Sequence, residues 1–348
     1  MEKKIYLVGG AVRDKLLNIV SNDKDYVAIG YTKEEFSHLE CVGKDFPVFL
    51  LEDGNELALA RREKKTSNGY NGFSVDTQGV SLEEDLSRRD LTINSIAYDE
   101  ENDIIIDPFE GQKDIQNKIL RHTTKAFKED PLRVLRLARF YARFGSEWII
   151  ADETKKLVKS MKEELQYLQK ERVYKEIDRV LEYKEWYLFF AILKELEVLT
   201  IVFPIVAKSF ILEKCQIVTS RLSKLVLVYQ DSLKTIDDFD VEFCKKEKQN
   251  IVLLIQRVED VKKFDQLNDT QKVFFFTSFR KNNALFFEFL YLSNLLNISI
   301  KTSFFVNVFE SINTYSPKDW IDQQNKQIKP QDMQQHIFDV NLEYIKGN

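Results

Sequence analysis

The spacing of apolar and polar positions divides the chain into a strand-rich first part and a helical remainder. Short apolar runs bounded by turn residues predict strands at Lys4–Val8, Tyr26–Ile29, Phe46–Leu51, Leu57–Arg61 and Ile104–Asp107. Apolar residues at three- and four-residue spacing predict helices at Pro131–Phe144, Thr154–Gln169, Lys175–Tyr183 and Trp186–Leu196. Several Phe-, Leu- and Ile-rich helices are expected within residues 205–312.

The distribution of turn residues supports the same division. Ten of the eleven glycines lie at or before Gly145, and no proline occurs between Pro204 and Pro317. Hairpins need such residues, so the chain after about residue 125 should be almost wholly helical. The sequence therefore predicts an α+β protein, with an α/β unit first and all-α domains after it.

Composition and charge narrow the class of protein. The chain has 348 residues, of which 44% are hydrophobic and 31% charged, and no apolar run reaches the ~18 residues of a membrane span. Its three cysteines lack metal-ligand spacing, and the chain begins directly with a strand. We expect a cytoplasmic protein with no membrane association and no obligate protein partner. The net charge of −5 argues against a protein that coats nucleic acid non-specifically.

Candidate chemistry begins near the N-terminus. A buried strand is followed by the turn Gly9-Gly10, a short helix over about residues 11–17, and then Asp23 and Asp25 on an expected second strand. Residues two apart on a strand point to the same face, so these carboxylates should project side by side. They would repel each other unless a cation lay between them, and Mg²⁺ takes oxygen ligands.

The same segment suits a phosphate group. A glycine turn that leads into a helix N-terminus presents free N–H groups to an anion, and Arg13 adds a guanidinium in the first helical turn. The chain contains neither GxxxxGK[ST] nor GxGxxG, so this is not a P-loop or a Rossmann fingerprint. A phosphate cradle beside a metal dyad indicates a phosphoryl- or nucleotidyl-transferase.

A second cluster lies in residues 81–99. Ser81 and Glu84 form a possible capping box, so the segment can be interpreted simply as the start of an amphipathic helix. Arg88-Arg89-Asp90, however, precedes an expected apolar helix, and cations at a helix N-terminus are unfavourable. An anionic ligand would offset that charge.

A third cluster begins at Asp130. Asp130 before Pro131 is an ordinary helix start, but that interpretation leaves Arg133, Arg136 and Arg139 unexplained. At three-residue spacing, Asp130, Arg133 and Arg136 share one side of the helix. A carboxylate beside a guanidinium matches the amino donor and ring-nitrogen acceptor of cytosine and adenine, whereas guanine and uracil present the reverse. Such a pair would accept CTP and ATP and reject GTP and UTP.

The motifs LVGGAVRD, DKD, DLSRRDLTINSIAYD, EDPLRVLRLARF and KERVYKEIDRVL, in this order, resemble those of class II tRNA nucleotidyltransferases. These are the bacterial and eukaryotic CCA-adding enzymes, grouped with bacterial poly(A) polymerases. The resemblance covers about residues 4–185. It implies a nucleotidyltransferase head over 1–125, a helical neck over 126–185, and a helical body and tail over 186–348 that bind tRNA.

The resemblance also implies roles for particular residues. Gly10 and Arg13 would hold the triphosphate, and Asp23 and Asp25 would bind Mg²⁺ and be catalytic. Arg89 would contact the nucleotide, with Asp90 near the ribose. Asp130 and Arg133 would form the amino-acid template, and Arg136 would reach the nucleotide from the same helix. Glu56 is a candidate third carboxylate of the metal site. Partners would be tRNA, ATP and CTP.

Several alternatives remain open at the level of sequence. The chain could add all of CCA, only CC or only A; it could be a poly(A) polymerase; or it could be a catalytically silent RNA-binding relative. A mobile loop expected within residues 60–73 favours CCA or A addition, because CC-only members lack a loop there. With three histidines and no His-Asp pair, no phosphohydrolase site is expected. Asn18 stands where the family usually has Gly, and Asn tolerates the left-handed conformation.

Overall fold

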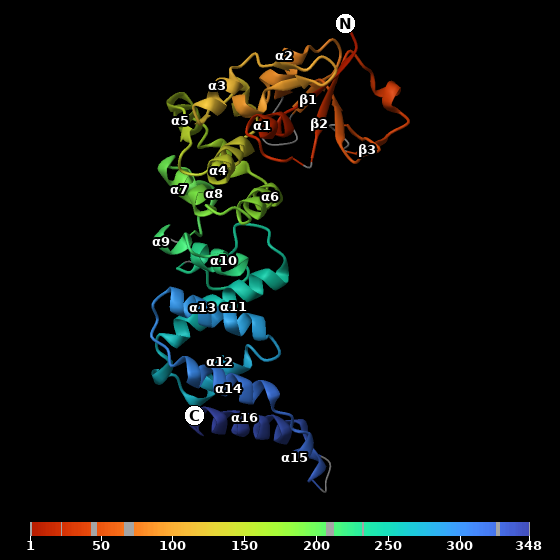
Figure 1. The fold of residues 1–348 in the computed structure, drawn as a ribbon. Coiled ribbons are helices and arrows are strands. Elements are labelled where there is room, and N and C mark those ends of the chain that lie inside the picture. The colour runs from red at the N-terminus through yellow and green to blue at the C-terminus, as the bar shows by residue number, and fades with distance from the viewer. Residues whose placement is uncertain are drawn as a thin grey trace. The chain divides into compact units, whose positions relative to one another are not determined.

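A computed structural model describes residues 2–21, 23–42, 47–65, 73–206, 212–231, 233–324 and 328–347. The chain forms two compact units, Met1–Pro204 and Ile205–Asn348, which are described separately (Figure 1). The further division of the chain into head, neck, body and tail stays a prediction. Within the described ranges, no helix combines the length and the apolar character that crossing a membrane requires.

The first unit contains a seven-stranded mixed sheet in the order β3-β4-β5-β2-β1-β8-β9. Its strands are β1 (Lys4–Val8), β2 (Asp25–Ile29), β3 (Glu40–Val42), β4 (Val48–Leu50), β5 (Glu56–Leu59), β8 (Ala97–Asp99) and β9 (Ile104–Ile106). The five predicted strands are all present, with ends shifted by at most two residues over the described part; Phe46 lies outside it. Val27 and Ile29 of β2 belong to one core cluster and Ala28 to another. The central strand is therefore buried on both faces, which explains its continuous apolar run.

Two small ladders were not predicted. β10 (Ile119–Leu120) pairs in parallel with β11 (Ile149–Ile150), and β6 (Arg62–Lys65) pairs antiparallel with β7 (Phe73–Asp76). The second ladder places the two ends of the segment in which a loop was expected, residues 60–73, in strands, so the expectation of a loop stays a prediction for the residues between them. Residues 66–72, the centre of the expected loop, lie outside the described residues.

Helices of the first unit surround and follow the sheet. They are α1 (Gly10–Leu16), η1 (Lys33–Phe36), α2 (Leu82–Ser87), η2 (Thr92–Asn94), α3 (Gly111–Gln116), η3 (Lys125–Glu129), α4 (Leu132–Phe144), α5 (Asp152–Lys159), η4 (Glu164–Tyr167), α6 (Lys170–Val180), α7 (Tyr187–Glu195) and α8 (Leu199–Val202). Asn18, just after α1, has φ of 57°, so the left-handed turn expected there is confirmed.

Two predicted helices differ from the structure. The helix expected over Thr154–Gln169 is interrupted after Lys159, where the Ser160 hydroxyl donates to the Leu157 carbonyl oxygen at 2.6 Å and so competes with the helical ladder. The helix expected over Lys175–Tyr183 instead runs from Lys170 to Val180.

The second unit contains only helices among its described residues. They are α9 (Leu212–Cys215), α10 (Arg221–Tyr229), α11 (Lys245–Val261), η5 (Phe264–Gln266), α12 (Asp269–Thr277), α13 (Asn283–Leu295), α14 (Thr302–Thr314), α15 (Lys318–Asp322) and α16 (Pro330–Gly347). Its core is rich in phenylalanine; Phe275, Phe276, Phe279, Phe286 and Phe289 are fully buried. The predicted α+β class, with a helical second half, is confirmed.

Candidate active site

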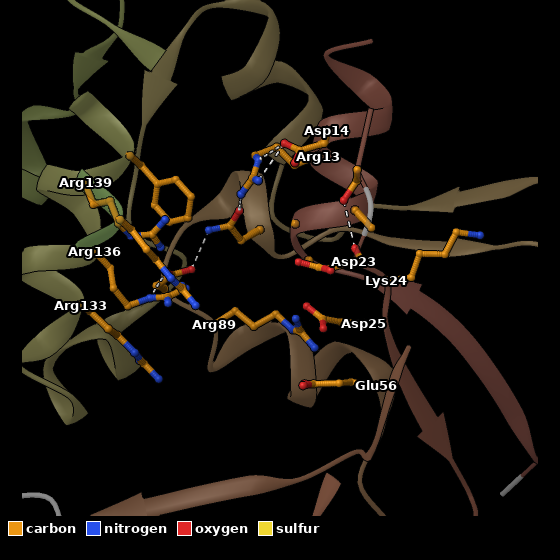
Figure 2. Close-up of a pocket in the computed structure, with 18 of the residues that line it drawn as sticks. Arg13, Asp14, Asp23, Lys24, Asp25, Glu56, Arg89, Arg133, Arg136 and Arg139 are labelled. Carbon is orange, nitrogen blue, oxygen red and sulfur yellow. Dashed lines mark hydrogen bonds and ion pairs between the residues drawn. The ribbon is translucent and has the colours of Figure 1, made fainter. Parts of the chain in front are cut away.

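A cavity of about 900 Å³ in the first unit collects almost every residue singled out from the sequence (Figure 2). Its wall comes from the start of α1, from β2 and β5, from the segment after α2, and from α4 and α6. The predicted site residues on this wall are Gly10, Arg13, Asp23, Asp25, Glu56, Arg89, Asp90, Asp130, Arg133 and Arg136. The fold thus brings together three motifs that are far apart in the chain.

The carboxylates lie at the ends of two neighbouring strands. Asp25 begins β2, Glu56 begins β5, and these two residues are register partners in the parallel pair. Asp23 precedes the strand, so the expectation that both aspartates lie on it is wrong for Asp23. Two hydrogen bonds hold the backbone next to it: the Ser21 hydroxyl donates to the Asp23 carbonyl oxygen at 3.0 Å, and the Lys24 N–H donates to Asn55 at 3.2 Å. Figure 2 shows the Asp23 and Asp25 side chains directed into the same space, with Glu56 close by.

The electrostatics of this corner favour a bound cation. Desolvation by the surrounding protein raises the pKa of Asp25, although its carboxylate still faces the cavity; Arg89 opposes the rise and Asp23 adds to it. Carboxylate oxygens are the ligands that divalent Mg²⁺ prefers, and a cation between Asp23 and Asp25 would relieve their repulsion. Within the described residues, no three acidic, His or Cys side chains form a complete metal cage. Water or substrate oxygens would have to complete the coordination, as is usual for Mg²⁺.

The Gly9-Gly10 turn brings backbone close to an arginine. Gly9 has φ of 72°, a conformation that favours glycine, and a Cβ there would lie 3.0 Å from Nη1 of Arg89, so the end of that side chain would have to shift. Arg13, three residues into α1, is only 3% exposed. It donates from Nε and Nη2 to Asp14 at 2.9 and 2.8 Å and from Nη1 to Asn94 at 2.5 Å, so protein acceptors hold its orientation at the cavity wall.

The Arg88-Arg89-Asp90 segment does not precede an apolar helix, which corrects the sequence interpretation. Arg88 caps the C-terminal end of α2, where a cation is favourable, and the residues after Asp90 form a short 3₁₀ turn and β8. The capping box of Ser81 and Glu84 is confirmed at the other end of α2. The placement of these arginines therefore needs no ligand to explain it.

Asp85 organises the two arginines. This fully buried carboxylate accepts from Arg88 Nη2 at 2.5 Å, from Arg89 Nη2 at 3.0 Å and from the Arg61 N–H at 3.2 Å. Burial alone would raise the pKa of Asp85, but Arg89 and Arg88 hold it at about 2. The buried Nε of Arg89 has no hydrogen-bond partner among the residues that the structure describes. An acceptor on a bound ligand would satisfy this donor.

The start of α4 carries the expected base-reading pair. Asp130 accepts the Leu132 N–H at 3.1 Å at the start of the helix. Because α4 begins at Leu132 with Pro131 as its N-cap residue, the expected positions of Asp130 at the N-cap and Pro131 in the first helical position are each one residue too far into the helix. Arg172 of α6 also donates two hydrogen bonds to Asp130, from Nη1 at 3.1 Å and from Nη2 at 2.7 Å. Arg133 is 7% exposed and donates to the Ala126 carbonyl oxygen at 2.6 Å.

Further along α4, Arg136 donates from Nε to Asp90 at 2.7 Å, which ties the helix to the segment after α2. Burial alone would raise the pKa of Asp90, but Arg136 and Asn94 hold it well below its usual range. Sequence reasoning did not single out Asn94. It also missed three of the arginines that line the cavity, Arg143, Arg172 and Arg179. The KERVYKEIDRVL motif contained a signal for two of them, because Arg172 and Arg179 are two helical turns apart.

The cavity is strongly basic although the chain is acidic. Ten arginines and Lys24 line it against six carboxylates, whereas the whole chain carries a net charge of −5. Positive charge concentrated in one concave site attracts polyanions, and guanidinium groups suit phosphate. The site can therefore hold a phosphorylated ligand beside a carboxylate corner for a divalent ion.

Comparison with known proteins agrees with this fold. Residues 5–121 match the poly A polymerase head domain, and residues 149–210 match a probable RNA and SrmB-binding site of polymerase A. The class defined by fold and site is thus a polymerase-type head joined to helical domains. Over residues 5–210 the chain belongs to the family of class II tRNA nucleotidyltransferases and bacterial poly(A) polymerases. Use of a divalent metal ion is general in this family, and the carboxylate corner fits it.

Among curated relatives, the CCA-adding enzyme of Francisella tularensis subsp. novicida (strain U112) is 51% identical over 208 residues, covering 58% of this chain and 56% of the relative. The multifunctional CCA protein of Shewanella denitrificans is 53% identical over 208 residues, covering 58% and 50%. The chain thus spans about half the length of the curated relatives it matches.

Solved structures share the fold over nearly the whole chain. A CCA-adding enzyme in complex with CTP has a TM-score of 0.70 at 20% identity, covering 100% of this chain and 88% of that one. The Thermotoga maritima CCA-adding enzyme complexed with tRNA has a TM-score of 0.68 at 19% identity, covering 99% and 88%. At this identity the likeness extends to the fold alone.

Proposed function

We propose that this protein is a CCA-adding tRNA nucleotidyltransferase, which adds C, C and A to the 3′ end of tRNA from CTP and ATP without a nucleic-acid template. The observation that carries the proposal is the shared cavity: Asp23 and Asp25 face a cluster of arginines beside the helix that follows Asp130. The names of the curated relatives support it over the 208 aligned residues, 58% of the chain.

The proposed reaction joins the RNA 3′-oxygen to the α-phosphorus of the nucleotide and breaks the bond to the β-phosphate, so that pyrophosphate leaves. Asp23 and Asp25 would hold Mg²⁺, with Glu56 beside Asp25. Bound Mg²⁺ would lower the pKa of the 3′-hydroxyl and stabilise charge on the departing pyrophosphate. Gly10 and Arg13 would position the triphosphate, and Arg89 would donate its unpaired Nε–H to the nucleotide. Catalysis would then consist mainly of positioning and charge stabilisation.

Base selection would depend on the start of α4. The Asp130 carboxylate would accept from the exocyclic amino group of cytosine or adenine, and Arg133 would donate to the ring nitrogen next to it. Guanine and uracil would place donor against donor and acceptor against acceptor, and unpaired buried groups give strong rejection. Arg136 would reach the nucleotide from the same helix.

The proposed partner is tRNA, held by the helical part of the chain through shape and phosphate contacts. A tRNA-processing role would place the protein in the cytoplasm. The KERVYKEIDRVL helix, α6, lies within the segment that matches the probable RNA-binding site and contributes Arg172 and Arg179 to the cavity.

The decisive experiment incubates the full chain with Mg²⁺ and three tRNA substrates, which lack CCA, CA or only the terminal A. Each NTP is supplied singly and then CTP is supplied with ATP. The proposal requires C on the first two substrates, A on the third, and complete CCA with the mixture. Products that end in CC or gain only A would identify a specialist, and long A tails would identify a poly(A) polymerase. No extension, together with tRNA binding, would identify a silent RNA-binding relative.

A further inference from the structure

A chain of hydrogen bonds, here called the polar ring, runs from α4 to α1 and back to α4. The helix α4 itself closes it. From α4, Arg136 donates to Asp90 Oδ2 at 2.7 Å, and Asn94 Nδ2 donates to Asp90 Oδ1 at 2.9 Å. Arg13 Nη1 then donates to Asn94 Oδ1 at 2.5 Å. The ring has six members: Arg13, Asp14, Asp90, Asn94, Arg136 and Arg143.

The ring closes through Asp14. Arg13 donates to Asp14 Oδ1 at 2.8–2.9 Å, and Arg143 donates to Asp14 Oδ2 at 2.9 Å. Arg143 lies seven residues after Arg136 on α4, so the two side chains leave the same face of the helix, and their Cα atoms are roughly 10 Å apart along its axis. The helix itself thus completes the ring.

Asn94 is the uncharged member of the ring and the one that must both donate and accept. It lies between two charged groups, Arg13–Asp14–Arg143 and Asp90–Arg136, and hydrogen-bonds to both. The residue is 6% exposed. A carboxylate at this position would accept from Arg13 but would repel Asp90. An apolar residue would remove the acceptor of Arg13 Nη1 and one of the two donors to Asp90 Oδ1, whose other donor is the Leu91 N–H.

We propose that Asn94 is a positioning residue that couples the triphosphate half of the site to its base-reading half. This inference rests on the proposed function. The position of Arg13 depends on Asn94, and so, through Asp90, does the position of Arg136. The hydrogen bonds of the ring are polar and mostly buried, so water does not readily replace a partner that moves away. A displacement of one side chain therefore displaces its neighbours. Binding of the triphosphate would therefore set the alignment of α4 against the base.

The test measures base selectivity, which does not depend on how much of a variant is folded. Kd values for CTP and UTP with Mg²⁺ are obtained by calorimetry, and relative kcat/KM values for C and U addition come from the tRNA assay. Asn94→Asp should lower the CTP/UTP preference about tenfold, the effect of losing one hydrogen bond to a charged group. The swap Asp90→Asn with Asn94→Asp keeps the ring charge and a donor between the two positions, so it should recover most of that loss.

Two further variants sharpen the result. Arg143→Gln opens the ring roughly 20 Å along α4 from Asp130 and should also lower base selectivity, which a purely local role of Asn94 would not produce. Asn102→Asp is the matched control, because Asn102 donates to Asp99 at 2.9 Å but does not line the cavity; its selectivity should be unchanged.

An unchanged CTP/UTP ratio in Asn94→Asp, or a swap no better than the single change, would overturn the coupling while leaving tRNA extension by the wild type intact. A wild-type protein that binds no nucleotide would overturn both this inference and the proposed function.

Discussion

At the scale of single residues, the site depends on carboxylates whose environments differ. Asp25 faces the cavity near Asp23, and desolvation raises its pKa, whereas Asp85 is fully buried and two arginines lower its pKa. The first arrangement leaves a negative corner for a cation to occupy, and the second fixes the arginines that flank it. A change at Asp25 should therefore lower activity but not stability, whereas a change at Asp85 should lower stability.

Asp25→Asn should reduce nucleotide addition by about three orders of magnitude, because a lost metal ligand removes several kcal/mol of charge stabilisation. The fold should persist, since the amide removes a repulsion with Asp23. Mg²⁺ with CTP should raise the melting temperature of the wild type but not of this variant. Asp103→Asn, an exposed change in the same unit that hydrogen-bonds Tyr98, is the control. Near-normal turnover by Asp25→Asn would contradict the metal assignment.

Asp85→Asn should destabilise the protein at neutral pH. The folded pKa of Asp85, about 2, lies below the ordinary value near 3.9, so its stabilisation is complete above about pH 4 and is lost as the pH falls toward 2. The variant should lose about 2–3 kcal/mol at pH 7. Urea unfolding of both proteins at pH 7, 5, 4 and 3 should show the difference narrowing only at the lowest values. If the difference in free energy of unfolding between the two proteins stayed constant over this range, the ion pairs of Asp85 would contribute nothing to stability.

At the scale of elements, α6 holds α4 through two ion pairs of opposite polarity. Arg172 of α6 binds Asp130 at the start of α4, and Glu176 accepts from Arg139 Nε at 2.6 Å, with both of the latter side chains buried. Because the pairs have reversed charges, α6 fits α4 in one register. The helix that we propose reads the base is thus oriented by its neighbour.

Arg172→Lys should lower discrimination against UTP and GTP several-fold while leaving the KM for tRNA within a factor of a few. A lysine can neutralise Asp130 but cannot supply the two-point fork that fixes the carboxylate plane. Misincorporation of each NTP into tRNA lacking CCA measures the effect. Lys156→Arg, on an exposed face of α5 away from the cavity, serves as the control. Selectivity equal to that of the wild type would show that Asp130 needs no external support.

The elements also show what local sequence pattern can and cannot predict. The strands that follow Asp25 and Glu56 and the helix that follows Asp130 were predictable, because their apolar spacing and capping residues are local. The segment after Arg89 was misassigned as a helix, since its apolar residues are buried by packing rather than by helical periodicity. Asn94 gave no pattern, because its partner Arg13 lies 81 residues away in the chain. Helical spacing points to Arg172, but its pairing with Asp130, 42 residues away, cannot be predicted from local pattern.

At the scale of the whole molecule, charge and hydrophobic cores are distributed unevenly. The basic cavity belongs entirely to the first unit, in a chain whose net charge is −5. Each unit has a core of its own, with the sheet clusters in the first and the phenylalanine cluster in the second. Nucleotide chemistry and tRNA retention should therefore be separable.

A fragment of residues 1–204 should fold and bind CTP with Mg²⁺ within about threefold of the full chain, because every residue that lines the cavity lies in it. Its KM for tRNA should rise at least tenfold, since 1.4 kcal/mol of lost phosphate and shape contacts is enough for that change. Calorimetry with CTP and steady-state C addition on tRNA lacking CCA measure the two effects separately. The full chain carrying Asp25→Asn, which should bind tRNA normally but not react, is the reciprocal control. If the fragment instead bound CTP and kept the tRNA KM of the full chain, the second unit would not hold the tRNA. The cavity and its surrounding helices in the first unit would then bind the RNA without the second unit.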